Sequence, residues 1–181
     1  MPILKKREMV ATEAKDTGVA QPLRVCFVCT GNTCRSPMAE AVTNAMADYA
    51  ISLLPDAVRH LATPSVDACS AGLYPVADAP ISQGALSALE QAGIPAIPGR
   101  DYHDHRARLL DLQMVERVDL LVGMTRGHAM ELLLRFPQAV GKIVCMPKEI
   151  TDPYGSDFAV YLSCLEQIKN GVQALFAEQL P

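Results

Sequence analysis

The sequence predicts a three-layer α/β fold, in which helices cover both faces of a four-stranded parallel sheet. Short apolar runs rich in β-branched residues alternate along the chain with longer segments of helical character. Such an alternation produces right-handed βαβ crossovers, which make neighbouring strands parallel and cover the sheet on both sides. The 181 residues are half hydrophobic, which is enough for one domain with a substantial core.

Four segments are predicted as strands because they are short, apolar and rich in residues of high β propensity. They are Leu23–Cys29, Ser65–Ala71, Asp119–Met124 and Lys142–Met146. Ligands of parallel sheets bind beyond the carboxyl ends of the strands. We therefore expect functional residues directly after these four segments.

The segments between the strands have helical patterns bounded by capping residues and helix breakers. The first predicted helix starts with Ser36 as N-cap and Pro37 at the first helical position. The other predicted helices are Ile81–Ala92, a segment that ends at Arg117, Arg126–Phe136 and Ser156–Gln179. Residues 55–64, 72–80 and the charged stretch 101–108 are predicted as loops.

Residues 1–22 are polar and aperiodic, so we expect a flexible N-terminal tail before a domain that covers residues 23–181. The tail lacks the apolar stretch of a signal peptide, and no apolar run approaches the ~20 residues of a membrane span. A net charge of −4 argues against a broad surface for nucleic acid or anionic membrane. We expect a cytoplasmic protein that binds neither nucleic acid nor membrane.

The six cysteines show no regular disulfide framework, which fits a reducing compartment. Cys26 and Cys29 have the C-x-x-C spacing, but residues three apart in a strand point to opposite faces. That geometry disfavours chelation, and no second cysteine pair completes a zinc site. We expect neither a metal nor a cofactor.

The segment that follows the first strand carries the chemistry. Cys29 and Arg35 form a C-x5-R loop between a buried strand and the start of a helix. Such a loop can turn backbone N–H groups inward as an anion nest, reinforced by the helix dipole. Gly31 and Asn32 permit the tight curvature, because Gly and Asn tolerate left-handed dihedral angles.

The charges of this loop suit phosphate chemistry. Arg35 can hold two phosphate oxygens and the charge of the transition state. The same positive field favours the thiolate form of Cys29, to which Ser36 can donate a hydrogen bond. The residues predicted to bind phosphate or substrate are Thr30, Gly31, Asn32, Thr33, Cys34, Ser36 and Tyr154. The alternatives are an ordinary βα turn with a packed cysteine and a nucleotide-binding loop. A nucleotide-binding loop would carry G-x-x-x-x-G-K-[ST] or G-x-G-x-x-G, and this sequence contains neither motif.

The string VCTGNTCRSPMAE, residues 28–40, resembles the signature of low-molecular-weight protein tyrosine phosphatases. Ser70-Ala71-Gly72 and Asp152-Pro153-Tyr154-Gly155 match two further family segments in the right order, and the likeness covers residues 23–180. The resemblance implies Cys29 as nucleophile, Arg35 as phosphate clamp and Asp152 as general acid, with phosphorylated proteins as substrates. It also implies that Asn32 and Ser70 brace the loop, and that Cys34 traps oxidised Cys29 as a disulfide.

Asp152 can also be argued from its position. It follows the fourth predicted strand, so we expect it at the same sheet edge as Cys29, where a carboxylic acid can protonate a leaving group. The alternative is an aspartate that starts an Asp-Pro turn. The histidines near other strand ends, His103, His105 and His128, are expected at the surface or at a helix cap.

The residue at position 33 bears on the substrate. Typical tyrosine phosphatases of this family have a bulky aliphatic residue there and two aromatic residues after the catalytic Asp-Pro. Here the residues are Thr33, and Tyr154 followed by Gly155, which looks like the bacterial protein arginine phosphatase branch. A threonine hydroxyl can bind a guanidinium N–H or the attacking water. We therefore favour phosphoarginine over phosphotyrosine, because a buried polar partner discriminates more strongly than apolar fit.

Two other classes of function are open to this loop. Arsenate reductases share it, but they need two further closely spaced redox cysteines, and none lies between Cys69 and Cys145. A module that only binds phosphoproteins would need neither the nucleophile Cys29 nor the acid Asp152.

Overall fold

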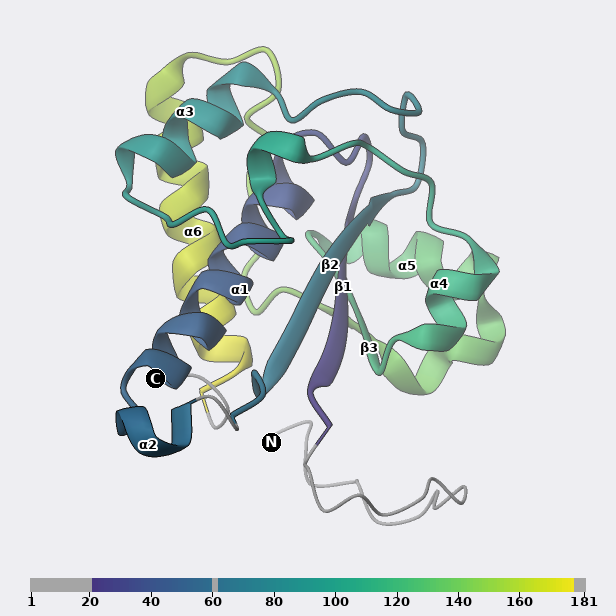
Figure 1. Ribbon diagram of the computed structural model, residues 1–181. Helices are drawn as coiled ribbons and strands as arrows, with labels where there is room; N and C mark the ends of the chain where they lie inside the picture. Colours follow the sequence, from purple (N-terminus) through teal and green to yellow (C-terminus); the bar gives the residue numbers. More distant parts are fainter. Residues whose placement is uncertain (1–20, 60–61, 178–181) are drawn as a thin grey trace.

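The computed structural model describes residues 21–59 and 62–177 and confirms the predicted parallel sheet (Figure 1). Its strands are β1 (Leu23–Cys29), β2 (Val66–Gly72), β3 (Leu120–Gly123) and β4 (Ile143–Cys145). They lie in the order β2-β1-β3-β4, and each neighbouring pair is parallel. The predicted tail 1–22 lies outside the described residues except for its last two positions.

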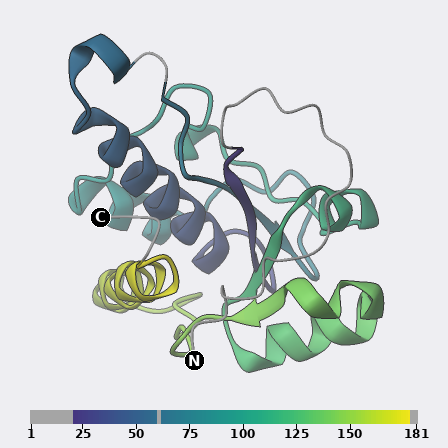
Figure 2. The ribbon, with the colours of Figure 1, turned by 90° about the horizontal axis from the view of Figure 1, so that it is seen from below.

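Helices cover both faces of the sheet, as the alternating pattern predicts (Figure 2). One layer consists of α1 (Arg35–Ser52), α3 (Gln83–Gln91) and α6 (Phe158–Leu175), and the other of α4 (Leu112–Arg117) and α5 (Arg126–Arg135). The short elements are α2 (Asp56–Arg59), η2 (Tyr102–Asp104) and η3 (Pro137–Lys142). The turn α2 lies in the segment predicted as loop, and the predicted last residues of the closing helix, 178 and 179, lie outside the described residues.

The central strand β1 sorts its side chains between the two layers by the period of two. Val25, Phe27 and Cys29 pack in the core under α1, α3 and α6, whereas Cys26 and Val28 pack in the core under α4 and α5. Cys26 and Cys29 therefore point to opposite faces of the sheet, as predicted from their spacing.

The carboxyl ends of the strands meet at one edge, where the loop after β1 is held by neighbouring segments. The amides of Leu73 and Tyr74 donate to the carbonyls of Cys29 and Thr30, each at 2.9 Å. A Cβ on Gly72 would lie 2.8 Å from the Thr30 carbonyl oxygen. The end of β2 can approach this loop so closely only because residue 72 has no side chain.

The prediction that Ser36 caps the first helix is wrong. Helix α1 begins at Arg35, with Cys34 at the N-cap position and no capping hydrogen bond from its side chain. Ser36 lies inside the first turn, fully buried, and its hydroxyl contacts the sulfur of Cys29 instead of a helix N–H. Because the helix begins at Arg35, Ser36 lies inside its first turn and not at its N-cap.

The structure also limits two other classes of site within the described residues. None of the helices there is both long enough and apolar enough to cross a membrane. In the same ranges, no group of three or more His, Cys, Asp or Glu side chains could hold a metal ion.

The outer edge of β2 is satisfied by a buried side chain of α1. The side-chain oxygen of Asn44 accepts a hydrogen bond from the Ala68 amide, and its Nδ2 donates to the Ala68 carbonyl, both at 3.0 Å. These groups belong to an edge strand, whose free N–H and C=O would otherwise be able to pair with another chain. Asn44 thus fixes α1, and the loop before it, against the sheet.

We expect Asn44→Leu to lower the free energy of unfolding by about 1–3 kcal/mol, because it buries an unpaired amide and carbonyl of Ala68. Urea unfolding measures the change. The matched control is Thr43→Val at the next buried polar position, whose hydroxyl only adds a 2.8 Å bond to the Ala39 carbonyl within the helix. Equal losses in the two variants would contradict a special role of Asn44 at the strand edge.

Candidate active site

The sulfur of Cys29 lies at the carboxyl end of β1, almost completely buried. The backbone N–H of Asn32 donates to it at 3.3 Å, and the hydroxyl of Ser36 lies 3.1 Å away. Two donors that converge on one sulfur suit a thiolate, which is the nucleophilic form of cysteine.

Asn32 holds the loop in its curved conformation. Its φ of 54° lies in the left-handed region, which asparagine tolerates better than most residues. Its Nδ2 donates to Ser36 and to Ser70, both at 2.9 Å, and its Oδ1 accepts from the Arg108 amide at 3.0 Å. The expected bracing contact between Asn32 and Ser70 is therefore present.

The curvature predicted for Gly31 comes from Asn32 instead. Gly31 is not among the residues of positive φ, and a Cβ there would meet only Thr33 Oγ1, at 3.8 Å. Its part in the site is to line the cavity in front of Cys29.

A chain of hydrogen bonds continues from Asn32 to a buried carboxylate. Ser70, which accepts from Asn32, donates to Glu40 Oε2 at 2.6 Å. Burial raises the pKa of Glu40, whereas the bond from Ser70 acts in the opposite direction.

A cavity of about 580 Å³ is lined by Glu40 but not by Cys29. We place the candidate active site at a smaller cavity, because the predicted nucleophile Cys29 lines it.

Arg35 and Asp152 meet at the mouth of the loop. Arg35 Nη2 donates to Asp152 Oδ2 at 2.6 Å, although 117 residues separate them in the sequence. The Arg35 side chain is buried and half of the Asp152 side chain is exposed. Within the described part of the chain, the buried Nε–H of Arg35 has no hydrogen-bond acceptor. This N–H can bind an oxyanion without losing a protein partner.

The cavity in front of Cys29 has a volume of about 470 Å³. Its lining includes most of the residues predicted from the sequence, namely Cys29, Thr30, Gly31, Thr33, Cys34, Arg35, Asp152 and Tyr154. Asn32 and Ser36 lie behind this lining, where they bond to the loop and to the Cys29 sulfur. The structure thus brings together the nucleophile, the clamp and the acid that the sequence predicts.

Tyr74 is a wall of this cavity that the sequence analysis missed. It lies after β2 and is 63% exposed, and Tyr154, which also lines the cavity, is 75% exposed. The Tyr74 hydroxyl donates to Glu131 at 2.8 Å, and the Arg135 guanidinium lies 4.2 Å from the ring centroid. Its position after the carboxyl end of a predicted strand was the available signal.

His128 is a second residue whose role the sequence did not reveal. It is buried, and its ring bridges Thr125 Oγ1 at 2.8 Å and Thr30 Oγ1 at 3.1 Å. Burial, followed by the positive charge of Arg35, lowers the pKa of His128 to about 4. The histidine is therefore neutral at pH 7 and fixes Thr30 without adding a charge beside Arg35.

His105 also departs from the solvated position predicted for it. It is half-buried, and its Nε2 lies 2.7 Å from the Asn32 carbonyl oxygen. Burial lowers the pKa of this histidine as well. His103 is exposed, as expected, and its ring contacts Asp101 and Glu90.

Cys34 and Cys29 are both free thiols that line the cavity. The thiol of Cys34 donates to Ser82 Oγ at 3.1 Å. A protective disulfide between the two residues stays a prediction.

A sequence model of the family described as low molecular weight phosphotyrosine protein phosphatase matches residues 24–180. A protein-arginine-phosphatase of Geobacillus stearothermophilus is 30% identical over 88% of this chain and 97% of its own. A low molecular weight protein-tyrosine-phosphatase of Streptomyces coelicolor is 32% identical over 85% and 92%.

Solved structures agree with this result. The YwlE arginine phosphatase from Geobacillus stearothermophilus superposes with a TM-score of 0.69 at 29% identity, over 87% of this chain and 92% of that chain. Relatives named for arginine and for tyrosine thus have similar identities, so overall identity does not decide the substrate.

We expect acid to destabilise the protein through His128. Its pKa in the folded state is about 4, while an unfolded histidine titrates near 6.5. Between these values the unfolded chain binds the extra proton, so the free energy of unfolding falls as pH decreases from about 6.5 to 4, by about 1–3 kcal/mol. His128→Gln, which cannot titrate, should lose correspondingly less stability over this range in urea unfolding. An NMR titration midpoint of His128 near 6.5 would contradict this expectation.

Proposed function

The chain belongs to the low molecular weight phosphotyrosine protein phosphatase family, and from this premise we propose that it dephosphorylates proteins through a cysteinyl-phosphate intermediate, with phosphoarginine as substrate. It is a hydrolase of this family. The observation that carries the mechanism is the convergence of Cys29, Arg35 and Asp152 on one cavity. We assign the catalytic domain to residues 23–181.

In the first step the Cys29 thiolate attacks phosphorus. An S–P bond forms while the bond from phosphorus to the leaving nitrogen or oxygen breaks. The loop N–H groups and the guanidinium of Arg35 hold the phosphoryl oxygens, and the free Nε–H of Arg35 supports this role. Ser36 and Asn32, which bond to the sulfur, hold it in position at the cavity.

Asp152 supplies a proton to the leaving group. Its carboxylate is paired with Arg35 Nη2, and the phosphate oxygens compete for that same N–H. Binding of phosphate therefore releases Asp152 from Arg35 and leaves the carboxyl group free to be protonated and to face the leaving atom. Its half-exposed position at the mouth of the cavity supports this exchange.

Water completes the cycle. Asp152, now a carboxylate, accepts a proton from the water that attacks phosphorus. The S–P bond breaks, inorganic phosphate leaves and the Cys29 thiolate is restored. None of these reaction steps requires a metal or a cofactor.

The preference for phosphoarginine rests on Thr33. Thr33 is half-buried in the cavity lining. Its hydroxyl can accept a hydrogen bond from a guanidinium N–H or orient the attacking water. Named arginine phosphatases among the relatives support this reading.

Phosphotyrosine is the second candidate, and one observation favours it. The lack of a second aromatic residue after Tyr154 disfavours a phenyl ring, but Tyr74, in the segment after β2, adds an aromatic side chain to the cavity lining. The two tyrosines give an apolar slot of the kind that holds flat groups, including both phenyl and guanidinium. With Tyr74 in the cavity lining, the aromatic residues no longer favour phosphoarginine over phosphotyrosine, and the preference for phosphoarginine rests on Thr33.

We place the enzyme in the cytoplasm. The mechanism needs Cys29 reduced, and glutathione and thioredoxin keep thiols reduced there.

We expect Asp152→Asn to lower kcat by about 10²–10⁴-fold for substrates with poor leaving groups, because the proton is needed in the transition state. The loss should shrink for aryl phosphates whose leaving group needs no protonation. Cys29→Ser defines zero turnover, because a serine hydroxyl is not ionised at neutral pH. Equal losses of Asp152→Asn on good and poor leaving groups would remove Asp152 from the role of acid.

Thr33→Ile tests the substrate. Loss of one buried hydrogen bond costs about 1–3 kcal/mol, or roughly one to two powers of ten in kcat/KM for phosphoarginine peptides. The added apolar surface should maintain or raise kcat/KM for phosphotyrosine peptides. The control is Thr33→Ser, which keeps the hydroxyl and should keep the preference. A ratio of the two kcat/KM values that Thr33→Ile leaves unchanged would assign Thr33 to loop packing. A wild-type ratio in favour of phosphotyrosine would support the second candidate.

A further inference from the structure

Cys26 and Cys69 are direct neighbours across two strands. They occupy the same register position of the parallel pair β1–β2, where Cys26 lies opposite Cys69. Adjacent strands are about 4.8 Å apart, and disulfides join Cα atoms that are about 4.4–6.8 Å apart. Both side chains belong to the core under α4 and α5, so the two sulfurs lie on the same face of the sheet.

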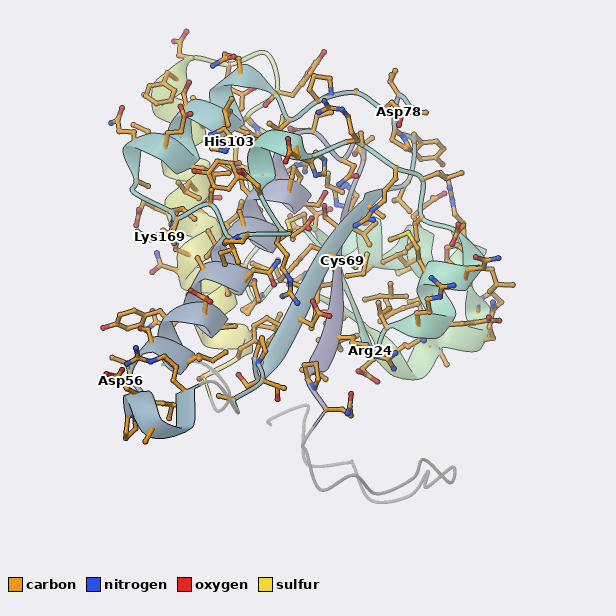
Figure 3. The ribbon with its side chains drawn as sticks, in the orientation of Figure 1. Arg24, Asp56, Cys69, Asp78, His103 and Lys169 are labelled. Carbon is orange, nitrogen blue, oxygen red and sulfur yellow. The ribbon has the colours of Figure 1, made fainter. Side chains whose placement is uncertain are left out.

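The two thiols differ in accessibility. Cys26 is fully buried on the central strand, whereas Cys69 is half-buried on the edge strand β2, on the side of α4 and α5 (Figure 3). A reagent from solvent therefore meets Cys69 first and Cys26 only through it.

The thiols also interact with each other. The close approach of the two thiols raises the pKa of Cys26 well above its ordinary value and lowers the pKa of Cys69, and the Cys26 thiol also lies 3.9 Å from the Phe27 carbonyl oxygen. The positive charge of Arg108, which donates to the Ser70 carbonyl next to Cys69, acts in the same direction on Cys69. Burial and the charge of Glu40 act to raise the pKa of Cys69, but the net direction is downward, so ionisation is favoured at Cys69 over Cys26.

We propose that Cys26 and Cys69 form a second dithiol site, which hydrogen peroxide closes into a reversible disulfide. The site is separate from the two cysteines of the active-site cavity, because Cys29 and Cys34 pack on the opposite face of the sheet. Both thiols are free in the structure, which corresponds to the reduced form.

The reaction has two steps. The Cys69 thiolate attacks peroxide, the O–O bond breaks, and Cys69 becomes a sulfenic acid as hydroxide leaves. The sulfur of Cys26 then attacks Cys69. The S–S bond forms, the S–O bond breaks, and the departing hydroxide takes the Cys26 proton to give water. The two thiols lose two electrons and peroxide gains them.

The sheet geometry makes this disulfide easy to reduce. Cβ atoms of directly opposed residues follow the strand spacing of about 4.8 Å, while a relaxed disulfide has a Cβ separation of about 3.8 Å. Closing the bond strains the strand pair, and strained disulfides are the reducible ones. The site is therefore expected to open again with a dithiol such as dithiothreitol.

Peptide mapping of the full-length wild-type chain tests the proposal. The protein is treated with hydrogen peroxide, its remaining thiols are alkylated after unfolding, and it is digested with trypsin and chymotrypsin. Cleavage after Arg24 and Phe27 separates Cys26 from Cys29 and Cys34. We expect a linked pair of the Cys26 and Cys69 peptides, about 2 Da lighter than the sum of the two free thiol peptides, which dithiothreitol abolishes.

Matched variants distinguish this bond from general oxidation. Cys69→Ala should leave Cys26 fully alkylatable after the same treatment, and Cys26→Ala should leave Cys69 as sulfenic or sulfinic acid. Cys145→Ala removes the other half-buried cysteine, whose register partner is Gly123, and should not affect the linked peptide. Recovery of Cys26 as a free thiol in oxidised wild-type protein would overturn the proposal, and so would a Cys69 peptide linked to Cys29 or Cys34.

Discussion

The side chain of Asn32 is the constraint on which the rest of the site depends. Held at a positive φ, it bonds to Ser36 in the first turn of α1, to Ser70 in β2 and to the backbone of Arg108. One amide group therefore connects the loop to three segments that are far apart in the sequence. Because its backbone N–H also bonds to the Cys29 sulfur, the same residue that shapes the loop positions the nucleophile.

The electrostatics of the site follow from this local arrangement and not from the whole molecule, which carries a net charge of −4. The positive charge belongs to Arg35, whose buried guanidinium holds Asp152 and whose Nε–H has no acceptor among the described residues. The low pKa of His128 prevents a second cation from forming beside Arg35 at neutral pH. Under the proposed function, capture of the anion depends on the buried Arg35 guanidinium and on the donors of the loop.

The residues that line the cavity contribute to the proposed recognition in two different ways. Tyr74 and Tyr154 at the mouth suit any flat group, and Tyr74 is fixed by Arg135 and Glu131 on α5. Thr33, which also lines the cavity, offers a hydroxyl, and we propose that it distinguishes a guanidinium from a phenyl ring by hydrogen bonding. Under the proposed function, the tyrosines would hold either flat group, and the choice between guanidinium and phenyl would depend on the Thr33 hydroxyl.

Local patterns in the sequence determined the strand order along the chain, the two-sided parallel sheet and the C-x5-R loop, because periodicity and loop spacing act over a few residues. They also predicted that Asp152 lies at the edge that holds Cys29, since strand ends share one edge in a parallel sheet. The tertiary structure decided what depends on distant partners. His128 bears no local mark of burial beside Arg35, and Ser36 has the sequence position of a helix cap although its hydroxyl faces Cys29. Those roles arise only when β1, β3 and the helices after them are packed together, because burial and hydrogen-bond partners are properties of the assembled edge.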